Sequence, residues 1–319
     1  MADRIDTLKI VCLGGGVGTS NLLRGIKHHN PQLTVITSMA DDGGSSGRLR
    51  KAYDIMPPGD IIYCIASLIP NDQKELEDLL LYRFPGENVD DKSIEGHKLG
   101  NLIMLAEIQR TGDFYKAIQV TKKLFGVTAD LLPATDEHVQ LCAITNDGRE
   151  VTSETTLDLA LYSEPYGLKN IFIKPNAPKV NPKVVEALMQ ADVIISGPGD
   201  LYTNQLPVLV VPEIKEAVLE SSANKIFIAN IANKPFETKG FMLNDFVHAI
   251  SDHLGTFPFN SIILNNNISL PMPAQYKYEY IRKGDIPSDI AVIEEDVVNA
   301  AFPIYHDPFK LAKAVIKAV

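Results

Sequence analysis

The first fifty residues combine two apolar segments with two glycine-rich turns, and this combination restricts the fold more than any other part of the chain. An apolar run over 8–13 stops at the first turn, a helix is expected over 21–26, and a second apolar run covers 33–40. A strand, a helix and a second strand in this order predict a parallel βαβ unit. Turns after parallel strands meet at the carboxyl edge of the sheet, where open α/β sheets bind ligands. We therefore predict an α/β fold, Rossmann-like and doubly wound with a mostly parallel sheet, and a phosphate-bearing nucleotide at this edge.

The first turn is predicted to bind phosphate through its backbone, because glycines let a ligand approach the main chain and the N–H groups of the following helix attract an anion. Thr19 and Ser20 are expected to cap that helix. The glycine spacing is G-x-G-x-G instead of G-x-G-x-x-G, and no Gly-Lys-Ser/Thr follows, so a P-loop is excluded. The alternative is a tight strand-to-helix turn without a ligand. The predicted contacts are Gly14, Gly15, Gly16, Val17, Gly18 and Thr19.

The second turn combines carboxylates, hydroxyls and a guanidinium group. Asp41 and Asp42 follow the end of the second strand, where an acidic residue often accepts from ribose hydroxyls. Carboxylate oxygens there also bind divalent cations. Ser45, Ser46 and Arg48 add donors that suit a phosphate group. The alternative is a solvated, flexible loop.

Two further motifs place polar side chains before helices. Asp60 follows Pro-Pro-Gly and precedes an apolar run over 61–65, which is expected to be a buried strand or the start of a helix. Asp60 either caps that element or contacts the ligand. His97 and Asn101 lie four residues apart, so a helix would place both side chains on one face. A single histidine is more often a satisfied structural residue, but a position between glycines at a helix start also suits binding.

The parallel pattern returns in the C-terminal half. An apolar strand over 192–196 ends in a third glycine-bearing loop, where Asp200 is placed to contact ribose or a metal ion, or to cap a helix. Asn230 and Asn233 follow the next strand, and their amides suit recognition of a base or sugar, with a turn role as the alternative. The contacts predicted in the third loop are Gly197, Gly199, Asp200, Tyr202 and Thr203. If Mg²⁺ binds, its expected ligands are Asp41, Asp42 and Asp200.

Residues 1–319 are expected to form a single domain with an antiparallel and helical subdomain inserted at about 70–180. The helices predicted in this part cover 72–84, 102–110 and 114–125. The strands predicted in it cover 139–144, 150–152 and 171–173. Asn-Asp-Gly at 146–148 is typical of a β-hairpin turn between the first two of these strands. Residues 86–95 are expected to form a surface loop.

Charge and cysteine content restrict the partners and the compartment. The chain has 30 basic and 40 acidic residues, a formal charge of −10, and no basic run that could cover a phosphate backbone, so duplex nucleic acid is not an expected partner. Cys12, Cys64 and Cys142 are far apart and are expected to pack as small apolar side chains in a reducing compartment. No signal peptide is recognisable, and no apolar run approaches the roughly 20 residues of a membrane span. We therefore expect a cytoplasmic protein.

Five motifs occur in a fixed order along the chain. They are the glycine turn at 14–18, Ala-Asp-Asp-Gly-Gly-Ser-Ser-Gly-Arg-Leu-Arg at 40–50, Pro-Pro-Gly-Asp at 57–60, Gly-His-x-Leu-Gly-Asn-Leu at 96–102 and Gly-Pro-Gly-Asp-Leu-Tyr-Thr at 197–203. Together they resemble the bacterial YvcK-type gluconeogenesis factor family, which is related to the CofD-type 2-phospho-L-lactate transferases. The chain departs from the family pattern at 62–63, where Ile-Tyr replaces a frequent Arg-Asn pair.

The resemblance implies a cytoplasmic, Rossmann-like protein that binds a nucleotide, a nucleotide sugar or a dinucleotide such as NAD, with ligands of the UDP-N-acetylglucosamine type favoured. It implies a role in cell shape and envelope precursor supply during growth on gluconeogenic carbon sources. The related transferases imply a divalent cation and the transfer of a phospholactyl or similar group.

Two hypotheses for the function follow. The first is a regulatory protein that binds a nucleotide sugar, because no nucleophile–base pair, Cys/His metal site or phosphate-loop lysine is recognisable. In it the turn at 14–19 holds the diphosphate, Asp41 or Asp200 holds ribose, and Asn230 and Asn233 read the base or sugar. Its expected partner is an enzyme of amino-sugar synthesis, and a homodimer is compatible with the sequence. The second is a CofD-like, Mg²⁺-dependent transferase acting on a nucleoside diphosphate-activated phospho-acid. Its candidate catalytic residues are Asp41, Asp42, Asp200 and His97.

Overall fold

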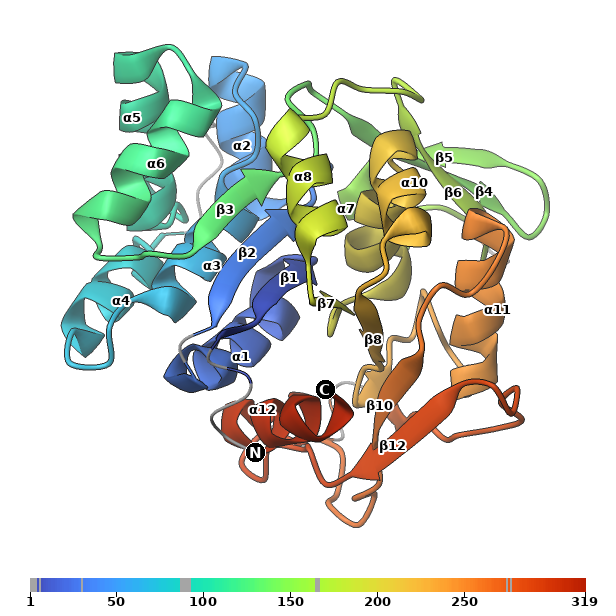
Figure 1. The fold of residues 1–319 in the computed structure, drawn as a ribbon. Coiled ribbons are helices and arrows are strands. Elements are labelled where there is room, and N and C mark those ends of the chain that lie inside the picture. The colour runs from blue at the N-terminus through green and yellow to red at the C-terminus, as the bar shows by residue number, and fades with distance from the viewer. Residues whose placement is uncertain are drawn as a thin grey trace.

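The computed structural model describes the chain except for residues 1–4, 6, 30, 87–92, 164–166, 274 and 276. Its centre is a seven-stranded sheet in which all neighbouring strands are parallel, with helices on both faces (Figure 1). In spatial order the strands are β12 (Ala291–Glu295), β10 (Ser261–Asn265), β8 (Asn224–Ile228), β7 (Val193–Ser196), β1 (Lys9–Leu13), β2 (Gln32–Thr37) and β3 (Asp130–Pro133). The chain moves outward from β1 through β2 and β3 on one side and through β7, β8, β10 and β12 on the other. This order confirms the predicted doubly wound, Rossmann-like α/β fold.

Apolar strands explain why helices cover both faces of the sheet. Strands β1, β7 and β10 bury nearly all their side chains, which is typical of parallel sheets that carry helices on both sides. Figure 1 shows α8 and α10 in front of the sheet and α1 behind it. A Cβ added to Gly25 of α1 would lie 1.9 Å from the Pro308 carbonyl oxygen, so α1 and α12 pack backbone against backbone. The longer helices around the sheet are α1 (Gly16–Ile26), α3 (Gly59–Leu68), α8 (Pro182–Gln190), α10 (Pro212–Glu220), α11 (Leu243–Leu254) and α12 (Pro308–Ala318).

The range 70–180, predicted as an inserted subdomain, consists of three different parts. Helices come first, namely α4 (Lys74–Leu81), α5 (Leu99–Thr111) and α6 (Phe114–Leu124). Strand β3 then joins the main sheet beside β2. A separate antiparallel sheet follows, made of β4 (Gln140–Thr145), β5 (Glu150–Thr152) and β6 (Leu168–Lys174). The pairing of Cys142 with Thr152 in this sheet matches the predicted hairpin. Of the predicted surface loop, residues 87–92 lie outside the described part of the chain.

Two segments near the turns differ from expectation. Residues 61–65 lie inside helix α3, so of the two alternatives for this run the buried strand is wrong. The loop expected after Asp42 continues as helix α2 (Gly44–Tyr53), in which small and charged residues predominate and Leu49 is the buried apolar side chain. Such a segment has no apolar period that would reveal a helix. Thr19 and Ser20 lie within α1, whose N-cap is Gly15, so their predicted capping role is also wrong.

Short elements complete the described structure. They are η2 (Lys27–His29), α7 (Glu154–Asp158), the π-helical turn η3 (Leu201–Gln205), α9 (Leu206–Leu209), β9 (Ala232–Asn233) and β11 (Glu279–Tyr280). Cys12, Cys64 and Cys142 are buried and form no disulfide, as expected. None of the helices in the described residues is both long enough and apolar enough to cross a membrane.

Candidate functional site

Three loops meet at the carboxyl edge of the sheet where the strand order reverses. Strands β1 and β7 are hydrogen-bonded neighbours although they are far apart in sequence, so the turn after β1 faces the loop after β7. Strand β2 pairs with the other side of β1 and brings the loop with Asp41 and Asp42 to the same edge. Doubly wound sheets bind ligands at such a switch point. We call the region bordered by these three loops the crevice, a name for its position at the switch point and not for a measured cavity.

The turns after β1 and β7 are in direct contact. A Cβ at Gly18 would lie 2.4 Å from the Pro198 carbonyl oxygen, and the Thr19 hydroxyl donates to the same oxygen at 3.5 Å. Gly16 has a φ of +65°, which residues with a side chain rarely adopt. Gly15 caps α1 without a side chain, so the cap residue does not compete for the N–H groups of the first helical turn. Together with Gly14 and the half-exposed Val17, these residues form one glycine-rich edge of the crevice.

Asp60 braces the first turn instead of capping its own helix, since no side chain caps α3. Its carboxylate accepts from the backbone N–H of Gly16, and a Cβ at Gly15 would lie 2.1 Å from its Oδ2. Asn204 also braces the turn, because its Oδ1 accepts from the Gly15 N–H at 3.2 Å and its Nδ2 donates to Asp60 at 3.5 Å. Burial, and then the charge of Asp41, raise the pKa of Asp60 to about 7.

Asp41 and Asp42 have different partners. Asp41 Oδ1 accepts from the Gly43 N–H at 2.9 Å, and burial raises the pKa of Asp41. Asp42 Oδ1 accepts from the Thr155 N–H at 2.9 Å and so fastens α7 to this loop. Glu154 of α7 adds a carboxylate that the sequence analysis missed; burial, and then the charge of Asp41, raise the pKa of Glu154 to about 9. A five-residue helix inside an insertion gives no sequence signal of its place at this edge.

Ser45 joins the second loop to the start of α5. Its hydroxyl hydrogen-bonds Nδ1 of His97 at 2.8 Å, accepts from Nδ2 of Asn101 at 2.9 Å and lies 3.4 Å from the backbone nitrogen of Lys98. His97 precedes α5 and Asn101 lies in its first turn. His97 thus lies outside the helix, so the two residues do not share a helix face as predicted; their side chains nevertheless converge, on the Ser45 hydroxyl.

Ser46 and Arg48 also bond to the protein itself. The Ser46 side chain forms a hydrogen bond with Asp41, which lowers the pKa of that carboxyl against the larger effect of burial. The Arg48 guanidinium donates to the backbone carbonyls of Glu95 at 2.8 Å and Ser93 at 3.1 Å. These contacts tie the second loop to the segment before α5.

The two asparagines after β8 serve neighbouring loops. Asn230 Oδ1 accepts from the Gly199 N–H at 3.0 Å and so supports the third glycine-bearing loop. Asn233 Nδ2 donates to the Phe241 carbonyl at 2.8 Å. Both contacts fit a turn role for these asparagines, which was the alternative to recognition of a base or sugar.

Lys234 lies among three carboxylates at the third loop. Its ammonium group bonds Asp158 and, at 2.8 Å, Asp200, and it lies 3.8 Å from Glu237. Oxygen atoms of the three carboxylates lie within 4.8 Å of one another. Burial opposes the charge of Lys234, but the three carboxylates together raise its pKa above the ordinary value. The predicted contact Asp200 is thus part of an ion-pair cluster that also includes a residue from α7.

Glu237 fixes the backbone of the third loop. It accepts from the Tyr202 N–H at 3.2 Å and from the Thr203 hydroxyl at 2.6 Å. Burial, and then the charge of Asp200, raise the pKa of Glu237 to about 8. Tyr202 and Thr203, both predicted ligand contacts, are therefore held by a fully buried carboxylate that the sequence analysis did not single out.

The carboxylates around Lys234 do not suit a divalent cation in this arrangement. A metal ion needs free carboxylate oxygens, whereas the Lys234 ammonium already neutralises Asp158 and Asp200. Asp41 and Asp42 lie on the second loop, and within the described part of the chain they belong to no comparable group of ligand atoms. The three residues predicted to share Mg²⁺ are thus not brought together in one cluster.

Lys98 is a second cation at the crevice that the sequence analysis missed. It is 7% exposed, and its Nζ lies 3.3 Å from the centre of the Tyr63 ring. Burial, and then Arg83, lower the pKa of Lys98 to about 8, while Asp60 and Asp41 oppose this change. A signal was available, because Lys98 is the basic residue of the motif at 96–102 and adjoins His97.

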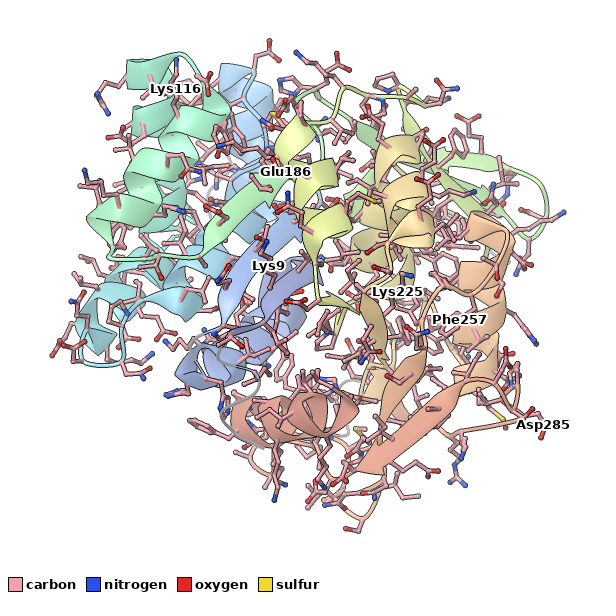
Figure 2. The ribbon with its side chains drawn as sticks, viewed as in Figure 1. Lys9, Lys116, Glu186, Lys225, Phe257 and Asp285 are labelled. Carbon is pink, nitrogen blue, oxygen red and sulfur yellow. The ribbon has the colours of Figure 1, made fainter. Side chains whose placement is uncertain are left out.

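A groove of about 1040 Å³ lies at the opposite, amino-terminal ends of β1, β2 and β3. Lys9 and Glu186 border it, and Figure 2 shows both beside the start of β1 and helix α8. It contains none of the predicted site residues. We therefore place the candidate site at the three loops, where the predicted site residues lie, and not in this groove.

Known proteins that resemble this chain have the same fold and show its family. A family model described as 2-phospho-L-lactate transferase CofD matches residues 10–302. The gluconeogenesis factor of Bacillus subtilis (strain 168) is 38% identical over 320 residues, covering 97% of each chain. A putative gluconeogenesis factor of Aquifex aeolicus is 36% identical over 336 residues, which is 97% of this chain and 96% of the relative. The crystal structure of a UPF0052 family protein from Bacillus halodurans has a TM-score of 0.88 and 34% identity, over 98% of this chain and 99% of that one. The chain therefore belongs to the CofD family and, within it, groups with the proteins named gluconeogenesis factors.

Proposed function

We propose that this protein binds a nucleotide or nucleotide sugar of the UDP-N-acetylglucosamine type in the crevice and acts in the cytoplasm as a regulatory protein. Its role would be to adjust envelope precursor supply and cell shape during growth on gluconeogenic carbon sources. The name of its relatives supports the link to gluconeogenic growth. The regulated partner would be an enzyme of amino-sugar synthesis, and NAD is a further ligand candidate.

The observation that carries this proposal is the lack of room for side chains where the first and third loops meet. Gly18 lies against the Pro198 carbonyl and Gly15 lies against Asp60. The N–H groups of Gly15 and Gly16 already donate to Asn204 and Asp60, so the donors offered to a diphosphate are those of Val17 and Gly18 in the first turn of α1. Because Asp200 is paired with Lys234, we assign the ribose contact to Asp41.

The contact between Ser45 and His97 does not suit nucleophilic catalysis, which requires an accessible nucleophile beside its base. The two side chains are 5% and 1% exposed, and the Ser45 hydroxyl also accepts from Asn101. This enclosed trio favours a structural role, and it supports regulation over turnover.

Isothermal titration calorimetry with UDP-N-acetylglucosamine, NAD and GDP tests the proposal. We expect saturable binding of at least one ligand by the full chain, strongest for the UDP sugar. Absence of binding by all three would end the proposal.

The alternative is a CofD-like, Mg²⁺-dependent transferase that acts on a nucleoside diphosphate-activated phospho-acid. Three carboxyl groups with raised pKa values, Asp41, Asp60 and Glu154, favour it, because a divalent cation beside them would stabilise their charged forms and would bridge them to a diphosphate. In this alternative Asp41 and Asp42 would hold the metal ion. Incubation with nucleoside triphosphates and phospho-acids or sugar phosphates, followed by mass spectrometry, tests it; a Mg²⁺-dependent product would favour catalysis, and inertness across the panel would leave regulation.

A further inference from the structure

We propose that the Lys98 ammonium group binds a phosphate group of the ligand in the crevice, beside the turn at 14–18. The group it takes is a phosphate or diphosphate anion, for which a lysine acts as a compact point charge. This inference deepens the proposed function and relies on it for the presence of a phosphorylated ligand.

The backbone of Lys98 is held in place at the start of α5. Its N–H lies 3.4 Å from the Ser45 hydroxyl, and the adjacent His97 and the nearby Asn101 bond the same oxygen. The side chain is 7% exposed and its Nζ rests 3.3 Å from the centre of the Tyr63 ring. A side chain fixed at both ends has lost most of its conformational freedom before a ligand arrives, which favours binding.

Among the residues that the structure describes, the ammonium group has no hydrogen-bond acceptor or ion-pair partner. No carboxylate oxygen of the described residues lies within 4.0 Å of Lys98 Nζ, and no hydrogen bond of this nitrogen is found among them. Lys234, by contrast, bonds Asp158 and Asp200 directly. A buried ammonium without an acceptor is costly, so the state of Lys98 indicates a partner that arrives from outside.

Asp60 links Lys98 to the first turn. Asp60 bonds the Gly16 N–H and lies against Gly15, and Tyr63, whose ring contacts the Lys98 ammonium group, follows it by three residues in α3. The Tyr63 carbonyl also accepts from the Ser20 hydroxyl of α1 at 3.3 Å. Lys98 and the N-terminus of α1 therefore border the same part of the crevice. Lys98 thus supplies a positive charge beside the glycine turn at 14–18, which contains no basic residue.

Charge compensation within the protein is a less suitable role for Lys98. The titratable groups that act on it are Asp60, Asp41, Arg83 and Tyr63. If its purpose were to neutralise the two carboxylates, an ion pair with one of them would be expected. Among the described residues, the close contact of the ammonium group is instead with the Tyr63 ring.

Calorimetry with inorganic pyrophosphate tests the inference without any base or sugar contact. We expect the Lys98→Met variant to bind pyrophosphate about 10- to 100-fold more weakly than the unsubstituted chain, as for the loss of a charged contact. Lys98→Arg should retain most of the affinity. Lys225→Met is the matched control, because Lys225 is 9% exposed and bonds the Ser221 carbonyl beside the amino end of β8, away from the crevice (Figure 2). It should bind as the unsubstituted chain does.

A pH series separates binding by Lys98 from a merely structural role. Between about pH 7 and about pH 9 the affinity of the unsubstituted chain should fall relative to that of Lys98→Arg, because only the lysine loses its proton in this range. Unfolding curves of each variant show whether it is folded. Equal pyrophosphate affinity of Lys98→Met and the unsubstituted chain, or no pyrophosphate binding at all, would overturn the inference.

The nucleotides distinguish failure of this inference from failure of the proposed function. If pyrophosphate binds in a Lys98-dependent manner but no nucleotide does, the proposed function fails and the inference stands. If a UDP sugar binds equally to the unsubstituted chain and to Lys98→Met, the inference fails and the proposed function stands.

Discussion

The backbone of Gly18 lies directly against the carbonyl oxygen of Pro198, so that a methyl group at Gly18 would approach this oxygen to 2.4 Å. Two loops far apart in sequence are thus held together at the switch point of the sheet. The proposed diphosphate site at this edge depends on that contact.

The Gly18→Ala substitution should weaken nucleotide binding at least about tenfold, because the new methyl group forces the two loops apart. It should also cost about 1 to 3 kcal/mol of unfolding free energy, as for other overpacked sites. Gly25→Ala is the matched control: it brings a methyl group to 1.9 Å from the Pro308 carbonyl, at the α1–α12 contact outside the crevice. Calorimetry and thermal unfolding should show that both variants lose stability and only Gly18→Ala loses affinity. Equal affinities in the two variants would count against the crevice.

Asp41→Asn and Asp42→Asn test the ligand and metal assignment. The amide oxygen of Asp42→Asn still accepts from the Thr155 N–H, so this variant should fold normally and report the loss of charge alone. We expect Asp41→Asn to weaken ligand binding and reduce any Mg²⁺ dependence, as removal of a carboxylate ligand requires. Calorimetry with and without Mg²⁺ provides the measurement. If affinity and metal dependence survive both substitutions, the site is placed wrongly.

The carboxylates of the crevice should lower stability as the pH rises. The folded-state pKa values of Asp60 and Glu154, about 7 and about 9, lie above the unfolded values of 3.8 and 4.5, so the folded chain holds more protons. The unfolding free energy should therefore fall between about pH 4 and about pH 9. Glu154→Gln should flatten this slope and stabilise the protein by at least about 1 kcal/mol near pH 8. Urea unfolding across this range measures it, and an unchanged slope in the variant would contradict the account.

His253 should have the opposite dependence on pH. Its Nε2 accepts from the Ile171 N–H at 2.9 Å and its Nδ1 donates to the Ala249 carbonyl at 2.6 Å, an arrangement that requires the neutral ring. Burial lowers the pKa of His253. Its contribution to stability is therefore present above the unfolded value of 6.5 and is lost as the pH falls through the lower folded-state pKa. Amide hydrogen exchange at Ile171 should lose protection faster on acidification than exchange in β7, and equal behaviour of the two would exclude this role.

The parallel arrangement of the main sheet could be predicted because it follows from patterns of neighbouring residues in the sequence. Apolar segments of strand length, followed by glycine-rich turns and helices, predict parallel strands, and parallel strands bring their carboxyl ends to one edge. The meeting of the loops at Gly18, Asp41 and Gly197 follows from this. The helix after Asp42 was missed because its polar residues pack by contacts such as Ser45 with His97, which no apolar period reveals.

The charged groups behind the loops could not be predicted in the same way. Glu154 and Asp158 reach the crevice on α7, and their place depends on how the antiparallel sheet packs against the main one. The position of the Lys98 ammonium group depends on the Tyr63 ring, which belongs to a different helix and which no sequence pattern places beside it. Long-range packing of this kind leaves no regular spacing in one sequence.

Calorimetric titration of the full chain and of its Gly18→Ala and Gly25→Ala variants with UDP-N-acetylglucosamine, NAD and GDP decides whether the three loops form a nucleotide site. We expect saturable binding of at least one ligand by the unsubstituted chain, retained in Gly25→Ala and lost or strongly weakened in Gly18→Ala. Absence of binding to the unsubstituted chain, or equal binding by all three proteins, would contradict a nucleotide site at this edge of the sheet.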